Sequence, residues 1–418
     1  MTNLYSPLRS LKQGNWLKLI CGASFGHLPA VRNLTLAYAL AGADCIDVAA
    51  DAAVIAAARE GLQVAKAMAE TSALRGYSSK NTSPWLMVSL NDGEDPHFRK
   101  AQFDSTNCPQ ECPRPCQQIC PAQAIVFNRA IDEFSGVVTP SCYGCGRCLP
   151  ICPSQIITAQ SYVVKKEAIA PLVLSTGVDA VEIHTQVGRI AEFSQLWTSV
   201  QPWVNKLKLV AISCPDGEGL IDYLWSIYKI ICPLPCALIW QTDGRQMSGD
   251  IGDGTTIAAV KLAQKVLAAN LPGYVQLAGG TNSYTVPKLR AMGMLKRAGG
   301  AGGAGEAGGA GEASTCTLPL TSYSSMSHLA TSPSLNNNSQ TQNSKLKTQN
   351  YSHISGIAYG SYARVLLSPI LDRLEQISME QNHASSTIHL EEHPELLWEA
   401  VEVAHNLVSL LKSSPTAC

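Results

Sequence analysis

The chain has 418 residues, of which 46% are hydrophobic and 15% charged, with a net charge of −1. So much apolar material excludes a wholly disordered chain, and the balanced charge excludes the basic surface of a nucleic-acid-binding protein. There is no secretory signal and no uninterrupted run of about 20 apolar residues. We therefore expect a cytoplasmic protein with no membrane span and no disulfide framework.

Short apolar runs typical of strands alternate with helical runs along most of the chain. The predicted strands are 17–21, 45–48, 85–90, 180–184, 207–213, 236–240, 274–277 and 354–359. The predicted helices are 28–41, 52–70, 166–175, 189–200, 219–228, 255–269, 286–296, 362–380 and 394–412. Regular alternation predicts an α/β fold with a parallel sheet, and eight strand–helix units predict a closed (β/α)8 barrel. An open doubly wound sheet is the alternative.

Two insertions divide this pattern. The first carries a cluster of cysteines, and the second is rich in Gly, Ser, Thr, Asn and Gln, which is typical of a disordered linker. The predicted domains are the first part of the barrel (15–95), an iron–sulfur insert (96–165), the second part of the barrel (166–297), the linker (298–352) and the last strand with C-terminal helices (353–413). Since the cysteine insert follows the third strand, it leaves from the C-terminal face of the barrel.

The second half of the cysteine cluster has the spacing of a bacterial-type ferredoxin. It reads C-x2-C-x2-C-x3-C-P, through Cys142, Cys145, Cys148, Cys152 and Pro153. In two-cluster ferredoxins the fourth cysteine of such a run ligates the other cluster. The motif therefore predicts a second run.

That second run is present as Cys108, Cys112, Cys116 and Cys120, with three residues in each gap and Pro121 after it. Prolines stand at 109, 113 and 115, where glycines are expected. We predict two [4Fe–4S] clusters. One is bound by Cys120, Cys142, Cys145 and Cys148, and the other by Cys108, Cys112, Cys116 and Cys152. The alternative is two zinc ions with four thiolates each, although three closely spaced cysteines followed by Cys-Pro favour iron–sulfur clusters.

Polar residues at the ends of predicted barrel strands form a second group of candidates. His184, Asp47, Asp92 and Asp243 lie at or just beyond strand ends, where barrel enzymes place catalytic residues. They form no recognisable constellation in the sequence, so we assign no catalytic residue. The loops at 279–280 and 360–361 could bind the phosphate of a flavin or another phosphorylated ligand, but we favour ordinary strand-to-helix turns there.

The chain resembles the family of cyanobacterial light-dependent period proteins, which are iron–sulfur proteins of the circadian-clock input. The resemblance rests on the eight cysteines together with LKLICGAS (17–24), PWLMVSLNDGEDPHFR (84–99) and VQLAGGTN (275–282). It implies a non-enzymatic redox sensor that reports the light-dependent redox state of the cell to the clock and modulates its period. It also implies clock proteins as partners, namely a component of the Kai oscillator and the input histidine kinase.

The residues leave other functions open. An oxidoreductase could pass electrons from the two clusters to a flavin or a substrate in the barrel. A simple ferredoxin-like electron carrier is disfavoured, because about 300 further residues accompany the cluster domain.

Overall fold

The structure is a computed structural model. It describes residues 7–22, 28–77, 83–93, 99–120, 123–129, 132–139, 142, 148–161, 166–244, 256–296, 353–380 and 389–412. The predicted linker at 298–352 and Cys145 lie outside the described residues. Within the described ranges, no helix is both long and apolar enough to cross a bilayer.

Eight parallel strands close into a barrel, so the predicted barrel is confirmed and the open sheet is excluded. Their order around the barrel is β1-β12-β11-β10-β9-β8-β3-β2. Both faces of each strand are covered, which explains why these segments read as continuous apolar runs. The strands are β1 (Trp16–Gly22), β2 (Cys45–Ala49), β3 (Trp85–Asn91), β8 (Ala180–His184), β9 (Leu209–Pro215), β10 (Ala237–Asp243), β11 (Tyr274–Ala278) and β12 (Gly356–Tyr359).

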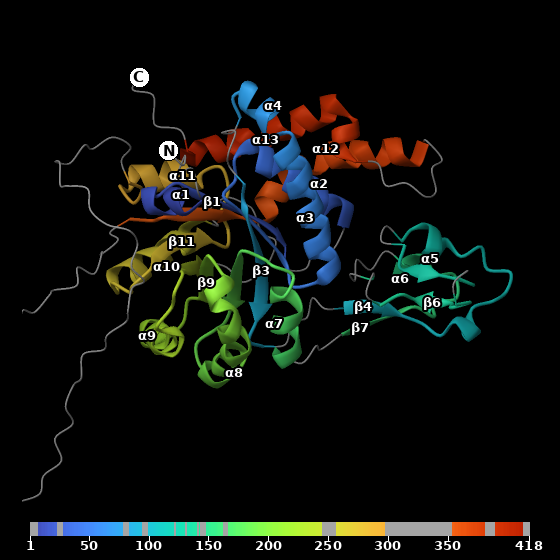
Figure 1. Cartoon of the computed structure of the whole chain (residues 1–418), viewed down its shortest axis with the longest axis horizontal. Helices are drawn as coiled ribbons and strands as arrows, with labels where there is room; N and C mark the ends of the chain where they lie inside the picture. Colours follow the sequence, from blue (N-terminus) through green and yellow to red (C-terminus); the bar gives the residue numbers. More distant parts are fainter. Residues whose placement is uncertain are drawn as a thin grey trace, which may run out of the picture.

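Helices surround the barrel (Figure 1). They are α2 (Leu28–Ala41), α3 (Ala52–Ala67), α4 (Ala69–Leu74), α7 (Lys166–Leu174), α8 (Ile190–Val200), α9 (Leu220–Ile231), α10 (Thr256–Ala268), α11 (Thr285–Ala291), α12 (Ser361–Glu380) and α13 (Pro394–Lys412), with 3-10 turns η2 (Gln201–Lys206) and η3 (Leu390–Glu392). The helix predicted at 52–70 is divided at Met68 into α3 and α4. The Ser72 hydroxyl of α4 donates to the Leu40 carbonyl at 2.8 Å, which holds the end of α4 against α2.

One helix that the sequence pattern did not predict, α1 (Pro7–Gln13), lies at the N-terminal end of the barrel. Its Leu11 is fully buried in an apolar cluster with Trp16, Trp85, Leu209 and Tyr274, which begin or nearly begin their strands. The Trp16 and Trp85 rings meet edge to face, with centroids 5.6 Å apart. These bulky side chains and α1 fill the N-terminal end, so the polar interior of the barrel lies toward the C-terminal end.

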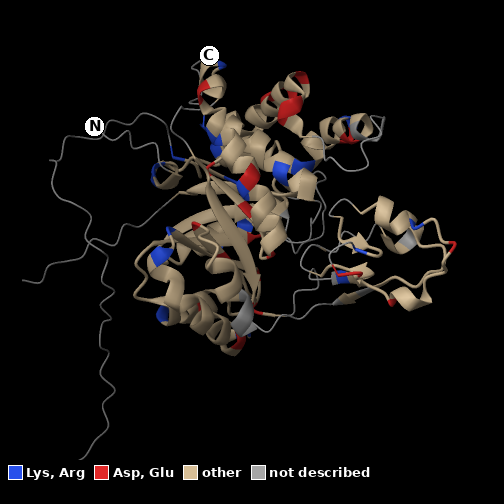
Figure 2. Ribbon diagram, turned by 45° about the vertical axis from the view of Figure 1, so that its right-hand side comes forward, with Lys and Arg blue, Asp and Glu red and all other residues tan. Residues whose placement is uncertain are grey.

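The cysteine insert forms a separate lobe between β3 and β8, beside the barrel (Figure 1). We call residues 99–161 the cysteine lobe. Its elements are β4 (Arg99–Gln102), η1 (Ser105–Asn107), α5 (Pro115–Gln118), β5 (Ile125–Val126), β6 (Gly136–Val137), α6 (Cys148–Ile151) and β7 (Thr158–Ser161). Strands β4 and β7 pair antiparallel, as do β5 and β6. Over the described residues of lobe and barrel, basic and acidic side chains are interspersed (Figure 2).

Candidate metal centre

The two halves of the cysteine lobe repeat one local structure. In each half a short helix, α5 or α6, leads into a Cys-Pro-x-Gln turn. The backbone N–H of Gln123 donates to the Cys120 carbonyl at 3.0 Å, and the backbone N–H of Gln155 donates to the Cys152 carbonyl at 3.1 Å. Both glutamines have a positive φ, of 49° and 52°. This match supports the internal duplication that the repeated sequence suggested.

Four of the predicted ligands lie together: Cys108, Cys112, Cys116 and Cys152, which we call the first thiol group. Burial raises the pKa of Cys108, and the neighbouring Cys112 and Cys152 raise it further. Burial also raises the pKa of Cys116, opposed by the Gln117 backbone N–H and reinforced by the other three thiols. Cys152 belongs to the second cysteine run, yet it lies with the first three cysteines of the first run. In the described part of the chain, no three donor side chains meet at the spacing of a single metal ion.

The other four predicted ligands are Cys120, Cys142, Cys145 and Cys148, which we call the second thiol group; Cys145 lies outside the described residues. Cys142 and Cys148 are buried, and Cys120 is partly exposed. The Cys142 sulfur accepts a hydrogen bond from the Ala101 amide at 3.4 Å, and the Cys120 sulfur accepts one from the Ala124 amide at 3.2 Å.

The donor set fits iron–sulfur clusters. Thiol sulfurs are the usual ligands of such clusters, and backbone N–H groups aimed at those sulfurs tune the reduction potential. The apolar core of the lobe supplies the low-polarity surroundings. This core is small: its buried members are Cys116, Ile125, Cys148, Cys152 and Ile157.

Arg114 is a residue of this site that the sequence analysis missed. It adopts a left-handed conformation, with φ 54°, directly before α5. Its guanidinium lies 4.2 Å from the centre of the Phe127 ring. It also lowers the pKa of Cys108, against the larger effect of burial. Arg114 is therefore a positive charge held close to the first thiol group. An arginine between two prolines was the available signal.

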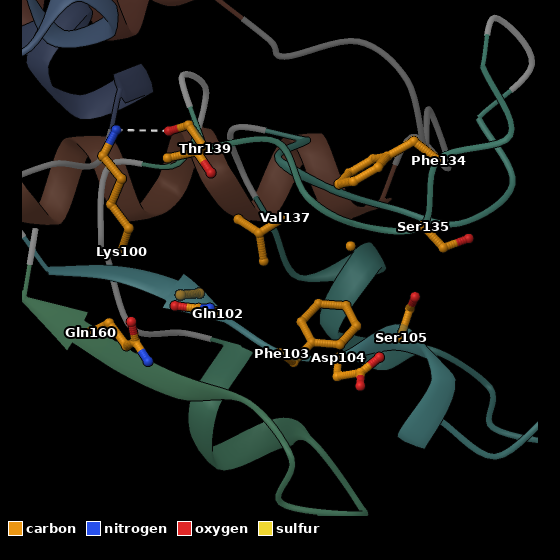
Figure 3. Close-up of a pocket in the computed structure, with 12 residues that line it drawn as sticks. Lys100, Gln102, Phe103, Asp104, Ser105, Phe134, Ser135, Val137, Thr139 and Gln160 are labelled. Carbon is orange, nitrogen blue, oxygen red and sulfur yellow. Dashed lines mark hydrogen bonds between the residues drawn. The ribbon is translucent and has the colours of Figure 1, made fainter.

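A hollow of about 400 Å³ opens on the lobe between β4 and the segment around β6 (Figure 3). Ala101, Phe103 and Val137 line it and also pack against the core that contains the cysteines. At its edge the Lys100 ammonium donates to the Thr139 carbonyl at 2.7 Å (Figure 3). The same ammonium lies 3.8 Å from a carboxylate oxygen of Asp51, at the start of α3. Lys100 thus connects the lobe to the barrel.

The candidates at the barrel strand ends separate into two places. Asp47, His184 and Asp243 belong to one polar network inside the C-terminal half of the barrel. Asp92 lies elsewhere: its carboxylate accepts a hydrogen bond from Thr185 and lies 3.5 Å from the Arg189 guanidinium.

Two charged members of that barrel network, Lys18 and Glu182, were missed. Glu182 lies two residues before His184 in β8, one layer further into the barrel, whereas no candidate had been named in β1, the strand of Lys18. The signal was a charged residue within an otherwise apolar strand, as in Leu17-Lys18-Leu19 and Val181-Glu182-Ile183. The glycines at 279–280 have φ values of 66° and 89°, and α12 begins at Ser361, directly after Gly360.

Comparison with known proteins indicates an iron–sulfur domain in the same part of the chain. Residues 108–163 match the family model described as the LdpA Fe-S cluster-binding domain. Residues 172–410 match the model described as the Light dependent period A C-terminal domain. Across 408 residues the chain is 43% identical to Light dependent period A of Synechococcus elongatus, which covers 98% of this chain and 94% of that protein.

Proposed function

This chain belongs to the light-dependent period A family, and we propose that it senses the redox state of the cell through two [4Fe–4S] clusters and passes that signal to the circadian clock. Membership makes it an iron–sulfur protein that acts in the light-dependent period. The sensing mechanism, the cluster number and type, the ferredoxin-like nature of the lobe and the partners are our proposal. We place the protein in the cytoplasm, where thiols stay reduced.

The grouping of Cys152 with Cys108, Cys112 and Cys116 carries the proposal. In a two-cluster ferredoxin each run lends its last cysteine to the other cluster. The first thiol group follows this rule, and the rule then assigns Cys120 to the cluster of the second thiol group. The matched turns at Gln123 and Gln155 support the same exchange, because both last cysteines are followed by the same backbone turn.

When bound, each cluster would supply reversible one-electron chemistry. The chain would supply the conditions for it. Apolar neighbours such as Ile125 and Ile157 limit the access of water to the sulfurs. The amide N–H groups of Ala101 and Ala124 favour the more negative, reduced state, and so does the charge of Arg114.

The charge of the lobe would then differ between redox states, and this difference would bias partner binding. Ile119, Phe134 and Ile151 are exposed by 38 to 40% on the lobe. Two of them directly precede Cys120 and Cys152. We propose that this apolar surface contacts a component of the Kai oscillator or the input histidine kinase.

Anaerobic purification tests the cofactor. We expect about eight iron atoms and about eight sulfide ions per chain. The protein should absorb at about 400 nm, and dithionite should bleach this absorbance. Stoichiometric zinc without sulfide would refute the assignment. In cells, Cys145→Ser and Cys148→Ser should abolish the dependence of clock period on light intensity. An unaltered response after verified cluster loss would rule out redox sensing by these clusters.

An oxidoreductase remains the second candidate, because the Lys100–Asp51 contact brings the lobe against a barrel with polar residues at its C-terminal end. This function requires an electron acceptor such as a flavin in the barrel. A structured flavin spectrum that survives acid extraction of iron would favour it over a sensor.

A further inference from the structure

The barrel contains a fully buried ion cluster in place of part of its apolar core. The Lys18 side chain is 0% exposed, and its ammonium lies 3.3 Å from an Asp47 carboxylate oxygen and 3.8 Å from the Met87 sulfur. It also pairs with Glu182. Burying three charged groups has a large desolvation cost, and apolar residues of similar volume are often at least as stable. Stability therefore does not explain the cluster, which makes this place a candidate site.

From this cluster, hydrogen bonds continue toward the C-terminal end of the barrel. Gln241 donates to Glu182 at 2.6 Å and to the Ser213 hydroxyl at 3.1 Å. Ser213 donates in turn to Asp243 at 3.2 Å. The His184 Nε2 lies 3.1 Å from the same Glu182 oxygen. The network ends at His184, which is 25% exposed, and at the partly exposed Asp243.

Most of the other inward positions at this end of the barrel hold small residues. Ser89 donates to Asp47 at 2.7 Å, which shows that it points into the barrel. Because side chains alternate along a strand, residues two positions apart share this inward face. Barrel cores normally have bulky branched residues at such positions. Here Ile20 and Asn91 are the larger residues, and the small ones are Ala49, Ser89, Ser213, Ala278 and Gly360.

The two groups at the end of the network can each form a further hydrogen bond. The His184 Nε2 faces the Glu182 carboxylate, so this ring nitrogen is the donor of that contact, and Nδ1 is the ring nitrogen left for a further partner. In the described part of the chain, the Asp243 carboxylate accepts one hydrogen bond, from Ser213, although a carboxylate can accept several. Burial raises the pKa of Asp243, while His184 lowers it.

The charges of the network do not balance. Among the described members of the network, Asp47, Glu182 and Asp243 are three carboxyl groups, and the groups that can carry a positive charge are two, Lys18 and His184. Burial raises the pKa of Asp47 to about 6, despite the opposing charge of Lys18. A further positive charge at this end would therefore be favourable.

We propose that the C-terminal end of the barrel binds a small molecule with a protonated amine, whose ammonium group sits on the Asp243 carboxylate beside the His184 ring. The Ser89 and Ser213 hydroxyls would accept a hydrogen bond from, or donate one to, a hydroxyl group of the same ligand. This site is separate from the thiol groups and does not depend on the cluster function. It is a binding site, and no reaction is assigned to it.

Ligand-observed NMR on the full chain tests the proposal with ethanolamine and with ethylene glycol, a neutral molecule of the same size. Saturable ethanolamine binding, at least about tenfold tighter than that of the glycol, is expected, since a charge-assisted hydrogen bond is roughly twice as strong as a neutral one. If the unmodified chain binds ethanolamine and ethylene glycol equally well, or does not bind ethanolamine, the proposal is overturned.

Asp243→Asn should weaken ethanolamine binding by about tenfold while leaving the iron content unchanged. The matched control is Asp216→Asn, an exposed aspartate just beyond β9 that pairs with Lys265. Ethanolamine binding should not change in this control. An equal loss in both variants would show attraction to surface charge in general, and would also overturn the site.

Discussion

The barrel and the cysteine lobe are stabilised in different ways. The barrel has one continuous apolar core between its strands and helices, with a second apolar cluster inside its N-terminal end. Among its described residues, the lobe has an apolar core with five buried members, three of which are the cysteines Cys116, Cys148 and Cys152. Its sheets have two strands each, and α5 and α6 have four residues each.

This difference shows which part needs a cofactor to fold. An isolated two-stranded sheet is marginally stable in water, and so small a core cannot offset the entropy of ordering the chain. Metal–thiolate bonds supply the missing free energy in domains of this kind. The barrel should therefore be stable by itself, and the lobe should fold only with its clusters.

Cluster removal is the strongest test of that difference. After anaerobic chelation of iron, amides in β4–β7 and β5–β6 should lose nearly all their protection, because the lobe loses its main source of stability. Barrel amides should stay protected. Hydrogen exchange read by mass spectrometry measures both parts in one experiment. A lobe that keeps its protection without iron would show that its apolar core suffices.

A pair of substitutions separates cofactor loss from packing loss. Cys148→Ser and Cys214→Ser each replace a buried thiol, in the lobe and in β9 respectively. Only Cys148→Ser should reduce the iron content and the protection of the lobe. Comparable iron loss in Cys214→Ser would contradict the assignment of ligands to the lobe.

The exchange of last cysteines gives the next largest effect. Cys152→Ser should remove the cluster of the first thiol group and about half of the iron. Adding Cys108→Ser should remove no more, since both residues serve one cluster, whereas adding Cys148→Ser should remove the rest. The iron content of the three variants decides the pairing. If adding Cys108→Ser removes the remaining iron and adding Cys148→Ser removes no more, Cys152 binds the same cluster as the other cysteines of its own run.

In the barrel the largest single effect should come from Lys18→Met. The change leaves Asp47 and Glu182 buried without their cation, which should lower the free energy of unfolding by about 3–5 kcal/mol. Urea denaturation measures it, and the lobe should keep its iron. The triple variant with Asp47→Asn and Glu182→Gln should regain much of the loss. Failure to regain any would mean that Lys18 acts through packing alone.

The sequence predicted these two parts unequally. The barrel could be predicted because its strands are buried on both faces and its helices are amphipathic, so local pattern and tertiary structure agree. Helix α1 was missed because its seven residues are mostly polar, and among them Leu11 is the fully buried member of the apolar cluster at the barrel end. The division at Met68 involves neither Gly nor Pro, so no local signal marks it.

Sequence spacing predicts the candidate cysteine ligands, because they lie close together along the chain, whereas it misses residues that only tertiary contacts bring to the site. The ferredoxin-type run specified its cysteines, and the duplicated Cys-Pro-x-Gln turn was visible in the sequence. The contact of Arg114 with Phe127 joins residues that no motif relates. The network of Lys18 likewise links strands far apart in the chain, and its charged residues were hidden within apolar runs.

The smallest expected effect concerns the contact between the two parts. One Asp51 oxygen caps α3 by accepting the amides of Ala53 and Val54, at 2.8 and 3.3 Å, and the other lies 3.8 Å from Lys100. Asp51→Ala should therefore lower the free energy of unfolding of the barrel by about 1 kcal/mol, mostly through the lost cap.

Lys100→Met keeps that cap and removes both the ion pair with Asp51 and the hydrogen bond to Thr139. It should leave barrel stability within about 0.5 kcal/mol of the wild type, because a partly exposed ion pair contributes little. Hydrogen exchange around Thr139 should nevertheless become faster, since the contact orders the edge of the lobe. If exchange there is unchanged in Lys100→Met but faster in Asp51→Ala, the α3 cap rather than Lys100 holds the lobe to the barrel. A redox signal would then have to pass through the connections that follow β3 and precede β8.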